Sequence, residues 1–145
     1  MSGKAKIAIV TGAGSGIGRA SALALLEDGW SGSLAGRRSD PLEETVSLAG
    51  AAGERTLVVP ADVADEDAMR NLFDKTKERF GRLDFLFNNA GMGVPPGGPD
   101  EIAFADWKKV VDANLHGSFL GIQNAFRLML SLIHISEPTR LGMIS

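Results

Sequence analysis

The chain has 145 residues, a formal net charge of −3 and 44% hydrophobic residues, which together describe one ordinary globular domain. It contains no cysteine, so the composition excludes a disulfide framework, a thiol nucleophile and a cysteine zinc site. Its 15 basic residues are outnumbered by 18 acidic residues, which argues against a nucleic-acid partner.

Short apolar runs alternate with stretches of helical spacing along the chain. In chain order the sequence predicts a strand over Lys6–Thr11, a helix over Ser15–Asp28, a strand over Ser33–Gly36, a helix over Pro41–Ala52, a strand over Thr56–Pro60, a helix over Asp65–Phe80, a strand over Leu83–Phe87 and a long helix over Phe104–Leu130, with a break expected near Gly117 or Gly121. This alternation, with short connections, indicates the α/β class: a doubly wound parallel sheet with helices on both faces.

Helical spacing also predicts which side chains are buried. The apolar face expected for the first helix is made of Ile17, Ala20, Leu23, Ala24 and Leu26. Trp107, in the long helix, is interpreted as a packing residue.

Neither a targeting peptide nor a membrane span is expected. The apolar run near the N-terminus is short and leads into glycines. The most apolar later stretch, Phe119–Ile135, carries amide, arginine and histidine side chains that do not suit a bilayer core, although an amphipathic helix at a membrane surface is an alternative. His116 and His134 have no second ligand at metal-binding spacing. The sequence therefore predicts a cytoplasmic protein with no membrane partner and no metal.

The segment TGAGSGIG (Thr11–Gly18) joins the first predicted strand to the first predicted helix. Glycines permit a tight turn and a close approach of a ligand to the backbone, and the N–H groups at the start of the helix favour an anion such as a pyrophosphate. No Gly-Lys-Ser/Thr closes the motif, which excludes a P-loop. A flexible turn that requires positive φ at several positions is the alternative.

The second predicted strand ends at Gly36 and is followed by Arg37 and Arg38. In a dinucleotide-binding fold this strand end meets the adenosine ribose, where an acid binds the 2′-hydroxyl and arginine suits a 2′-phosphate. No acid is present here. The arginines favour NADP(H), with NAD(H) as a possible second cofactor, and a solvated basic pair is the alternative.

Four motifs resemble those of the short-chain dehydrogenase/reductase family, in its order and in its strand or helix contexts. They are TGAGSGIG in the first turn, Asp62-Val63 after the third strand, NNAG (Asn88–Gly91) after the fourth strand and NLHG (Asn114–Gly117) in the long helix. The resemblance runs from about Lys4 to about Met129. It implies a Rossmann-type sheet of strand order 3-2-1-4, truncated after about four strands, and an NAD(P)-dependent oxidoreductase.

The resemblance also assigns roles to individual positions. The residues that would bind the cofactor are Gly12, Ser15, Gly16, Ile17, Gly18, Arg37, Asp62, Val63, Asn88, Ala90 and Gly91. Among them Arg37 would contact the 2′-phosphate, and Asp62 would accept a hydrogen bond from the adenine amino group. Asn114 matches the asparagine of the family's catalytic tetrad, which helps to hold a water in the proton relay.

Some of these residues have a purely structural interpretation as well. Asp62 could cap the turn before the predicted helix Asp65–Phe80, and Asn88 could serve as a turn former after a strand. Asn114 lies within a helix, where asparagine is a poor former, and an exposed asparagine without a role is the alternative.

The sequence differs from the family's pattern because most of the family's catalytic residues are absent. The family's reaction needs a serine, a tyrosine and a lysine after a fifth strand, with the last two spaced Tyr-x-x-x-Lys. This chain has no tyrosine and about half of the family's usual length. We therefore expect an inactive fragment of an enzyme that, when complete, acts on a small carbonyl or alcohol and forms homo-oligomers. A non-catalytic nucleotide-binding or interaction module is the alternative.

The end of the sequence resembles translated read-through of a sequencing adapter. Leu130–Arg140 (LSLIHISEPTR) equals the first-frame translation of a common transposase-type adapter, and Ile144 and Ser145 continue that frame after a short index. This hypothesis divides the chain into residues 1–129, the N-terminal dinucleotide-binding part, and residues 130–145, a non-native tail. A natural C-terminus is the alternative.

Overall fold

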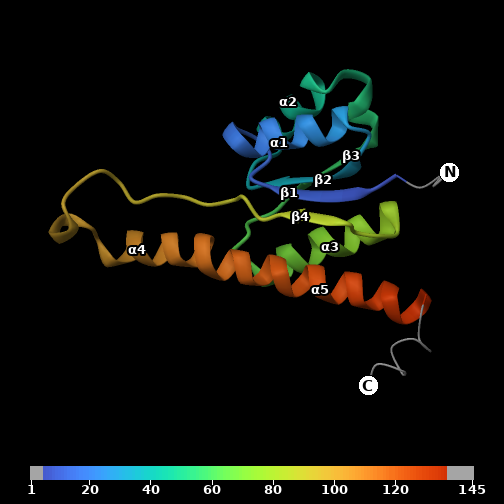
Figure 1. Cartoon of the computed structure of the whole chain (residues 1–145). Coiled ribbons are helices and arrows are strands. Elements are labelled where there is room, and N and C mark those ends of the chain that lie inside the picture. The colour runs from blue at the N-terminus through green and yellow to red at the C-terminus, as the bar shows by residue number, and fades with distance from the viewer. Residues whose placement is uncertain (1–4, 137–145) are drawn as a thin grey trace.

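Four parallel strands form the sheet at the centre of the computed structural model, which describes residues 5–136 (Figure 1). The strands are β1 (Ile7–Thr11), β2 (Ser31–Gly36), β3 (Thr56–Pro60) and β4 (Phe85–Phe87). Their order in the sheet is β3-β2-β1-β4, and every pairing is parallel. The predicted order 3-2-1-4 is confirmed. The chain reverses its direction of travel across the sheet between β1 and β4, where α/β proteins bind their ligands.

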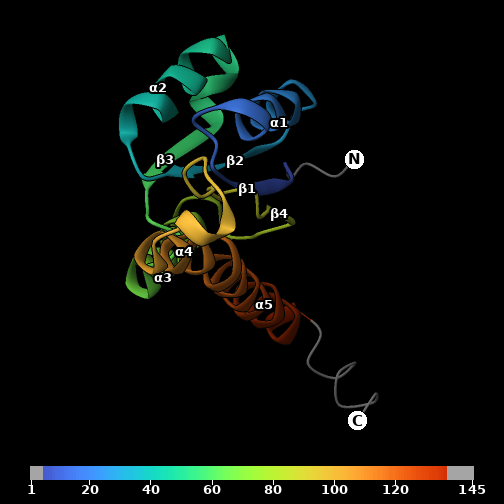
Figure 2. The ribbon, with the colours of Figure 1, turned by 90° about the vertical axis from the view of Figure 1, so that its left-hand side faces the viewer.

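Helices cover both faces of the sheet, as predicted (Figures 1 and 2). On one face lie α1 (Gly16–Glu27) and α2 (Ser39–Leu48), and on the other lie α3 (Glu66–Phe80) and α5 (Gly117–Ser136). The short helix α4 (Phe104–Val111) leads into α5 through the π-helical turn η3 (Asp112–His116). Two short 3-10 helices, η1 (Gly50–Arg55) and η2 (Pro99–Glu101), lie in the connections.

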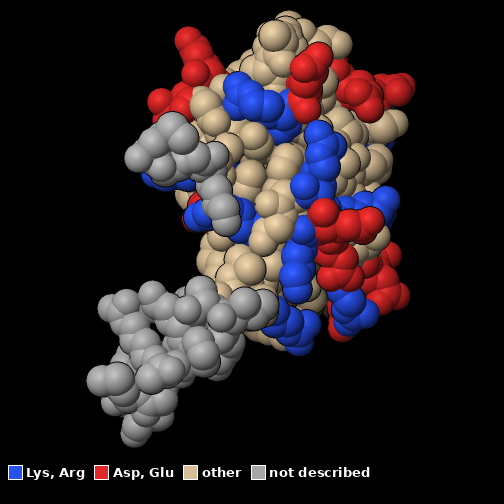
Figure 3. Space-filling model, turned by 90° about the vertical axis from the view of Figure 1, so that its right-hand side faces the viewer, with Lys and Arg blue, Asp and Glu red and all other residues tan. Residues whose placement is uncertain are grey.

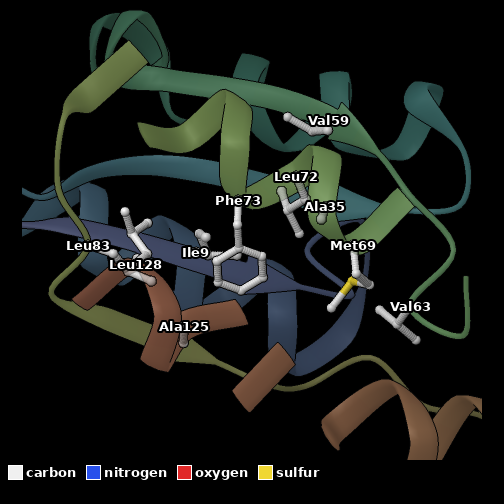
Figure 4. Close-up of a cluster of buried hydrophobic side chains, with 10 residues drawn as sticks. All are labelled: Ile9, Ala35, Val59, Val63, Met69, Leu72, Phe73, Leu83, Ala125 and Leu128. Carbon is white, nitrogen blue, oxygen red and sulfur yellow. The ribbon is translucent and has the colours of Figure 1, made fainter. Parts of the chain in front are cut away.

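A hydrophobic core lies on each face of the sheet. The larger core joins the sheet to α3 and α5, and Figure 4 shows Phe73 of α3 beside Ile9 of β1, with Ala125 and Leu128 of α5 in the same cluster. The smaller core joins the sheet to α1 and α2. All five residues of β1 are buried, because β1 has a strand on each side and a helical layer on each face.

The inward face of α1 differs from the predicted one. Leu26 is buried as predicted, but the other buried residues of α1 are Gly18 and Ala22, and Ile17 is 72% exposed. Spacing alone favoured the larger apolar side chains, but the start of this helix lies so close to the glycine turn that only small residues fit beneath it. A Cβ built on Gly18 would lie 2.0 Å from the carbonyl oxygen of Gly12.

Strand β2 begins two residues before the predicted strand, at Ser31. Its sequence contains glycine and serine where a strand usually carries large apolar residues. Gly32 is required because a Cβ there would lie 1.9 Å from the carbonyl oxygen of Ala8. Ser33 is fully buried, and its hydroxyl lies 2.7 Å from the hydroxyl of the equally buried Thr76 of α3, which satisfies both groups.

The remaining helical boundaries also refine the predictions. Helix α2 ends at Leu48 because Gly50, at φ +61°, turns the chain into η1. The break in the long helix lies at η3, just before Gly117, and α5 continues past Leu130 to Ser136. Trp107, interpreted from the sequence as a packing residue, is 52% exposed on α4.

An ion pair joins the start of β1 to the residues before β4. Asp84 accepts two hydrogen bonds from Arg82, at 2.9 and 2.5 Å, and a third from the backbone N–H of Ile7 at 2.8 Å. Burial by itself would raise the pKa of the Asp84 carboxyl, but these hydrogen bonds and the charges of Arg82 and Lys6 outweigh burial and lower that pKa.

On the molecular face drawn in Figure 3, basic and acidic side chains lie next to one another.

The pairing of Asp84 with Arg82 predicts a pH dependence of stability. A carboxyl whose pKa is lowered by folding stabilises the folded state above its unfolded pKa of about 3.9, and that contribution is lost as the pH falls through the lowered pKa. Asp84→Asn is expected to reduce the free energy of unfolding by about 1 kcal/mol at neutral pH and to flatten its decline below about pH 4. Denaturant titrations across this pH range measure both effects. The exposed Asp74 of α3 provides the control, Asp74→Asn, and equal profiles for the two variants would contradict the prediction.

Candidate functional site

The glycine turn lies between the end of β1 and the start of α1. Gly12 and Gly16 have φ values of +65° and +52°, a region that favours glycine. Ser15, the residue before α1, is extended and its side chain does not cap the helix. The first N–H groups of α1 have no partner within the helix, so the turn presents the donors and the positive end of a helix dipole to its surroundings.

A hydrogen-bonded network ties this turn to the segment after β4. The hydroxyl of the buried Thr11 accepts from the backbone N–H groups of Asn89 and Ala90, at 3.0 and 2.9 Å. The side-chain amide of Asn89 donates back to the carbonyl oxygen of Thr11 at 3.2 Å. Thr11 and Asn89 were not among the predicted site residues. In the sequence each of them is a polar residue at or just after the end of a strand. Their contact could be inferred only if the two strands were known to be neighbours in the sheet.

A cavity of about 800 Å³ lies at the carboxyl ends of the strands. Residues that follow each of the four strands line it: Gly12 after β1, Arg37 after β2, Asp62 after β3 and Ala90 after β4. Seven of the predicted cofactor-binding residues line this cavity, namely Gly12, Ser15, Arg37, Asp62, Val63, Ala90 and Gly91. The size suits a dinucleotide-sized ligand, and the position is the one at which open α/β sheets bind ligands.

The other predicted residues lie beside the cavity and do not line it. Gly18 packs against the glycine turn from within α1, and Ile17 projects from the start of that helix into solvent. Gly16 occupies open space, since a Cβ there would meet no atom of the described residues within 4 Å. The structure therefore brings seven of the predicted residues into one cavity wall, including two from the glycine turn, and places these three at the start of α1 outside that wall.

Asn88 joins β4 to α5. Its side-chain amide donates to the backbone carbonyl of Ser118 at 2.8 Å, and a Cβ on Gly121 would meet its side-chain oxygen at 2.8 Å. The side chain thus reaches across to a helix, which a residue that only forms its own turn would not do.

Asn114, in η3, holds the backbone of Met92 with both of its side-chain atoms. Its Oδ1 accepts from the Met92 N–H at 2.8 Å, and its Nδ2 donates to the Met92 carbonyl at 2.9 Å. Gly91 lies directly beneath this side chain, since a Cβ there would lie 2.9 Å from Oδ1. The side chain of Asn114 therefore has a structural role, because it fixes the segment that carries Gly91 and Met92, both of which line the cavity.

Asp62 has a structural contact as well as a place in the cavity wall. Its Oδ1 accepts from the backbone N–H of Ala64 at 2.9 Å, which is the turn-forming contact that was the alternative interpretation. The cap of α3 itself is Asp65, which accepts from Ala68 at 3.0 Å. Oδ1 of Asp62 thus stabilises the turn that Asp62 itself begins. Oδ2 makes no hydrogen bond within the described part of the chain.

Several lining residues come from helices that sequence reasoning did not connect to the site. Pro41 and Leu42 belong to the first turn of α2, and Lys109 belongs to α4. Asp112 also lines the cavity, and its carboxylate lies 3.5 Å from the Lys108 ammonium and 3.0 Å from Nδ1 of His116. No sequence motif marks these positions, because they reach the cavity only through the packing of α2 and α4.

Between residues 5 and 136, no group of three or more metal-ligating side chains converges on a point. Within the same part of the chain, no helix combines the length and the apolar character needed to cross a bilayer.

The residues present fit a nicotinamide dinucleotide. The glycine turn offers backbone donors and a helix N-terminus to a pyrophosphate, and Arg37 and Arg38 offer fixed positive charge at the end of β2. Asp62 offers a carboxylate acceptor, while Val63 and Ala90 offer apolar walls for a flat ring. Charged donors, an acceptor and apolar surface therefore line one cavity, in keeping with the chemistry of such a ligand.

Comparisons with known proteins identify the family to which this fold belongs. The family model described as short chain dehydrogenase matches residues 6–136. Levodione reductase of Leifsonia aquatica is 37% identical over 126 residues, which cover 86% of this chain and 47% of that protein. Glucose 1-dehydrogenase 2 of Bacillus subtilis is 35% identical over 127 residues, which cover 86% of this chain and 49% of that protein.

Solved structures extend the likeness to three dimensions. A crystal structure of levodione reductase superposes with a TM-score of 0.84 at 34% identity, covering 89% of this chain and 51% of the other. A variant of actinorhodin polyketide ketoreductase, solved with NADPH, gives a TM-score of 0.79 at 31% identity, covering 86% and 47%. The chain spans about half the length of the relatives it matches. On the family model, the sequence identity and the shared fold, this chain belongs to the short chain dehydrogenase family.

Proposed function

We propose that this chain carries the dinucleotide-binding part of an oxidoreductase that, when complete, transfers a hydride between NADP(H) and a small carbonyl or alcohol substrate. The observation that carries the proposal is the cavity at the carboxyl ends of the strands, with a glycine turn, a carboxylate and two arginines in its wall. The family binds NAD(P)(H), and NADP(H) is the proposed preference because Arg37 and Arg38 follow β2 where an acid would favour NAD(H).

The residues of this chain divide the work of binding. The turn formed by Gly12, Ser15, Gly16, Ile17 and Gly18 would hold the pyrophosphate. Arg37 would bind the 2′-phosphate, Asp62 and Val63 would hold the adenine, and Asn88, Ala90 and Gly91 would lie along the cofactor. When bound, the nicotinamide supplies or accepts the hydride.

The proposal assigns no catalytic activity to this chain alone. The general acid of the family is a tyrosine, and this sequence contains none. Asn114 would be its contribution to the catalytic tetrad, acting through the segment around Met92 that it holds. We further propose that residues 1–129 are the genuine dinucleotide-binding part and that residues 130–145 derive from adapter read-through.

Exposed apolar side chains support the proposal that the complete enzyme is a homo-oligomer. Phe104 and Trp107 of α4 and Phe119 and Phe126 of α5 are each more than half exposed. Exposure of several large apolar side chains on consecutive helices is typical of a surface that a partner covers.

Two measurements test the proposed function. Titration of the purified chain with NADP+ and NAD+ is expected to show binding of both, with the tighter binding for NADP+, and the absence of binding would contradict it. Resequencing the source DNA across the codons for Gln123–Ser145, without a transposase library, is expected to show a reading frame that continues into a Tyr-x-x-x-Lys segment. Recovery of the same tail and a stop codon would overturn the adapter hypothesis and support a non-catalytic binding module.

A further inference from the structure

An arginine outside the cavity wall holds two parts of that wall together. Arg19, in the first turn of α1, donates from Nη2 to the carbonyl oxygen of Gly14 at 2.6 Å and to the carbonyl oxygen of Pro41 at 3.0 Å. Gly14 belongs to the glycine turn and Pro41 to the start of α2, and both line the cavity. One guanidinium group therefore bridges the cofactor-binding turn and α2.

A buried hydroxyl completes the bridge. Thr45 of α2 is fully buried, and its Oγ1 accepts from Nε of Arg19 at 2.9 Å and lies 2.8 Å from the carbonyl oxygen of Ala13, to which it donates. The carbonyls of Ala13 and Gly14 are thus both held by groups outside the turn. The side chain of Arg19 is only 23% exposed, and its contact with the exposed Glu44 is the long one, at 3.4 Å.

Holding these two carbonyls also orients the donors of the turn. In a trans peptide unit the C=O and the N–H point in opposite directions. Because the carbonyl of Ala13 points toward Thr45, the N–H of Gly14 points away from Thr45. Because the carbonyl of Gly14 points toward Arg19, the N–H of Ser15 points away from the Arg19 guanidinium. A rotation of either peptide unit would misdirect a donor at the start of α1.

The same contacts set a distance within the site. Arg37 and Arg38 lie immediately before α2, whose first turn Arg19 holds through Pro41. Gly14 allows the close approach, because a Cβ there would lie 2.8 Å from Cβ of Pro41. This bridge therefore helps to set the spacing between the glycine turn and the arginines after β2, together with the backbone hydrogen bond from the N–H of Ala13 to the carbonyl of Ala35 at 3.1 Å.

We propose that Arg19 is a positioning residue for the dinucleotide: with Thr45 it fixes the donors of the glycine turn and their distance from Arg37. The inference rests on the proposed function, since it concerns the same cofactor. Arg19 is not itself among the residues that line the cavity, so its effect on binding is exerted through Gly14 and Pro41, which are.

The test compares Arg19→Met with the parent 145-residue chain. NADP+ binding is expected to weaken about tenfold, the equivalent of one charge-assisted hydrogen bond. NAD+ binding should weaken by a smaller factor, because NAD+ uses the turn but not the 2′-phosphate site. Titrations are run well below the melting temperature of each variant and corrected for the folded fraction. Arg70→Met is the matched control, since Arg70 makes only exposed ion pairs on α3.

Further variants separate positioning from simple stabilisation. Arg19→Lys can still reach the two carbonyls and is expected to recover part of the affinity. Thr45→Ser keeps the hydroxyl and should bind like the parent chain, whereas Thr45→Val should bind like Arg19→Met. Backbone amide NMR signals of Gly14 and Ser15 should shift in both weakened variants and not in Arg70→Met.

The outcomes distinguish this inference from the function on which it rests. If the parent chain binds neither dinucleotide, the proposed function fails and the inference fails with it. If the parent binds both and a folded Arg19→Met binds them equally well, only the inference is overturned. Should Arg19→Met fail to fold, the comparison of Thr45→Ser with Thr45→Val decides in its place, and equal affinities for that pair overturn the inference.

Discussion

Gly18→Ala is expected to lose about 3 kcal/mol of its free energy of unfolding, together with its binding of dinucleotides. The added Cβ would lie 2.0 Å from the carbonyl oxygen of Gly12 and 2.6 Å from Nδ2 of Asn89. The first of these is backbone, so no side-chain rotation relieves the overlap. Helix α1 must move away from the end of β1, and this movement displaces both the glycine turn and the residues after β4 that contact it.

Gly16→Ala provides the matched comparison within the same turn. Gly16 has φ +52°, but a Cβ there meets no described atom within 4 Å. Gly16→Ala is therefore expected to reduce the free energy of unfolding only through the strained backbone conformation, by about 1–2 kcal/mol. Denaturant unfolding of the two variants measures the difference. A Gly18→Ala variant no less stable than Gly16→Ala would mean that α1 can shift freely, contrary to the packing described for its inward face.

Arg37→Met is expected to weaken NADP+ binding about thirtyfold and to leave NAD+ binding nearly unchanged. A hydrogen bond between a guanidinium and a phosphate contributes about 2 kcal/mol, and the 2′-phosphate is the one group that distinguishes the two dinucleotides. Parallel titrations with NADP+ and NAD+ give the ratio directly. The substitution keeps much of the aliphatic length of the side chain, so the cavity wall is little changed.

Arg38→Met tests the assignment to one arginine of the pair. Both side chains line the cavity, and Arg38 is the residue that precedes α2. If Arg38→Met, and not Arg37→Met, lowers the affinity for NADP+, the 2′-phosphate contact belongs to Arg38. If both variants lose equal affinity for NADP+ and NAD+, the arginines attract both dinucleotides through their positive charge and do not select the cofactor.

Local sequence patterns located all four strands, although β2 begins two residues before its predicted start and β4 begins two residues after its predicted start. The individual residues at the strand ends were assigned by the resemblance to the family. The run at Lys6–Thr11 and the glycines after it form β1 and the turn, and Asp62 and Ala90 line the cavity because each follows a strand. Parallel strands bring all of their carboxyl ends to one edge, so a motif placed after a strand is placed at the site. This explains why the residues that the resemblance assigned to one cofactor come from segments that are distant in sequence.

Packing between elements could not be predicted in the same way. The inward face of α1 is chosen by how close the helix comes to the turn, and helical periodicity carries no information on that distance. The bridge from Arg19 to Thr45 joins two helices whose separation only the fold determines. The break in the long helix falls at η3 before its glycine, where Asn114 reaches Met92. In each case the contact that determines the local structure is made with a residue distant in the sequence.

The position of β1 in the middle of the sheet has a consequence for the order in which the chain folds as it is made. Strands β1, β2 and β3 are available once Pro60 has left the ribosome, but Ala8 pairs on its other side with Phe85. The 24 residues between β3 and β4, including α3, must be synthesised first. At about 5–20 residues per second this takes roughly one to five seconds, during which one edge of the central strand has no partner strand. Any sheet formed from β1, β2 and β3 during this interval would have an open edge at β1, to which a chaperone or a second nascent chain would have access.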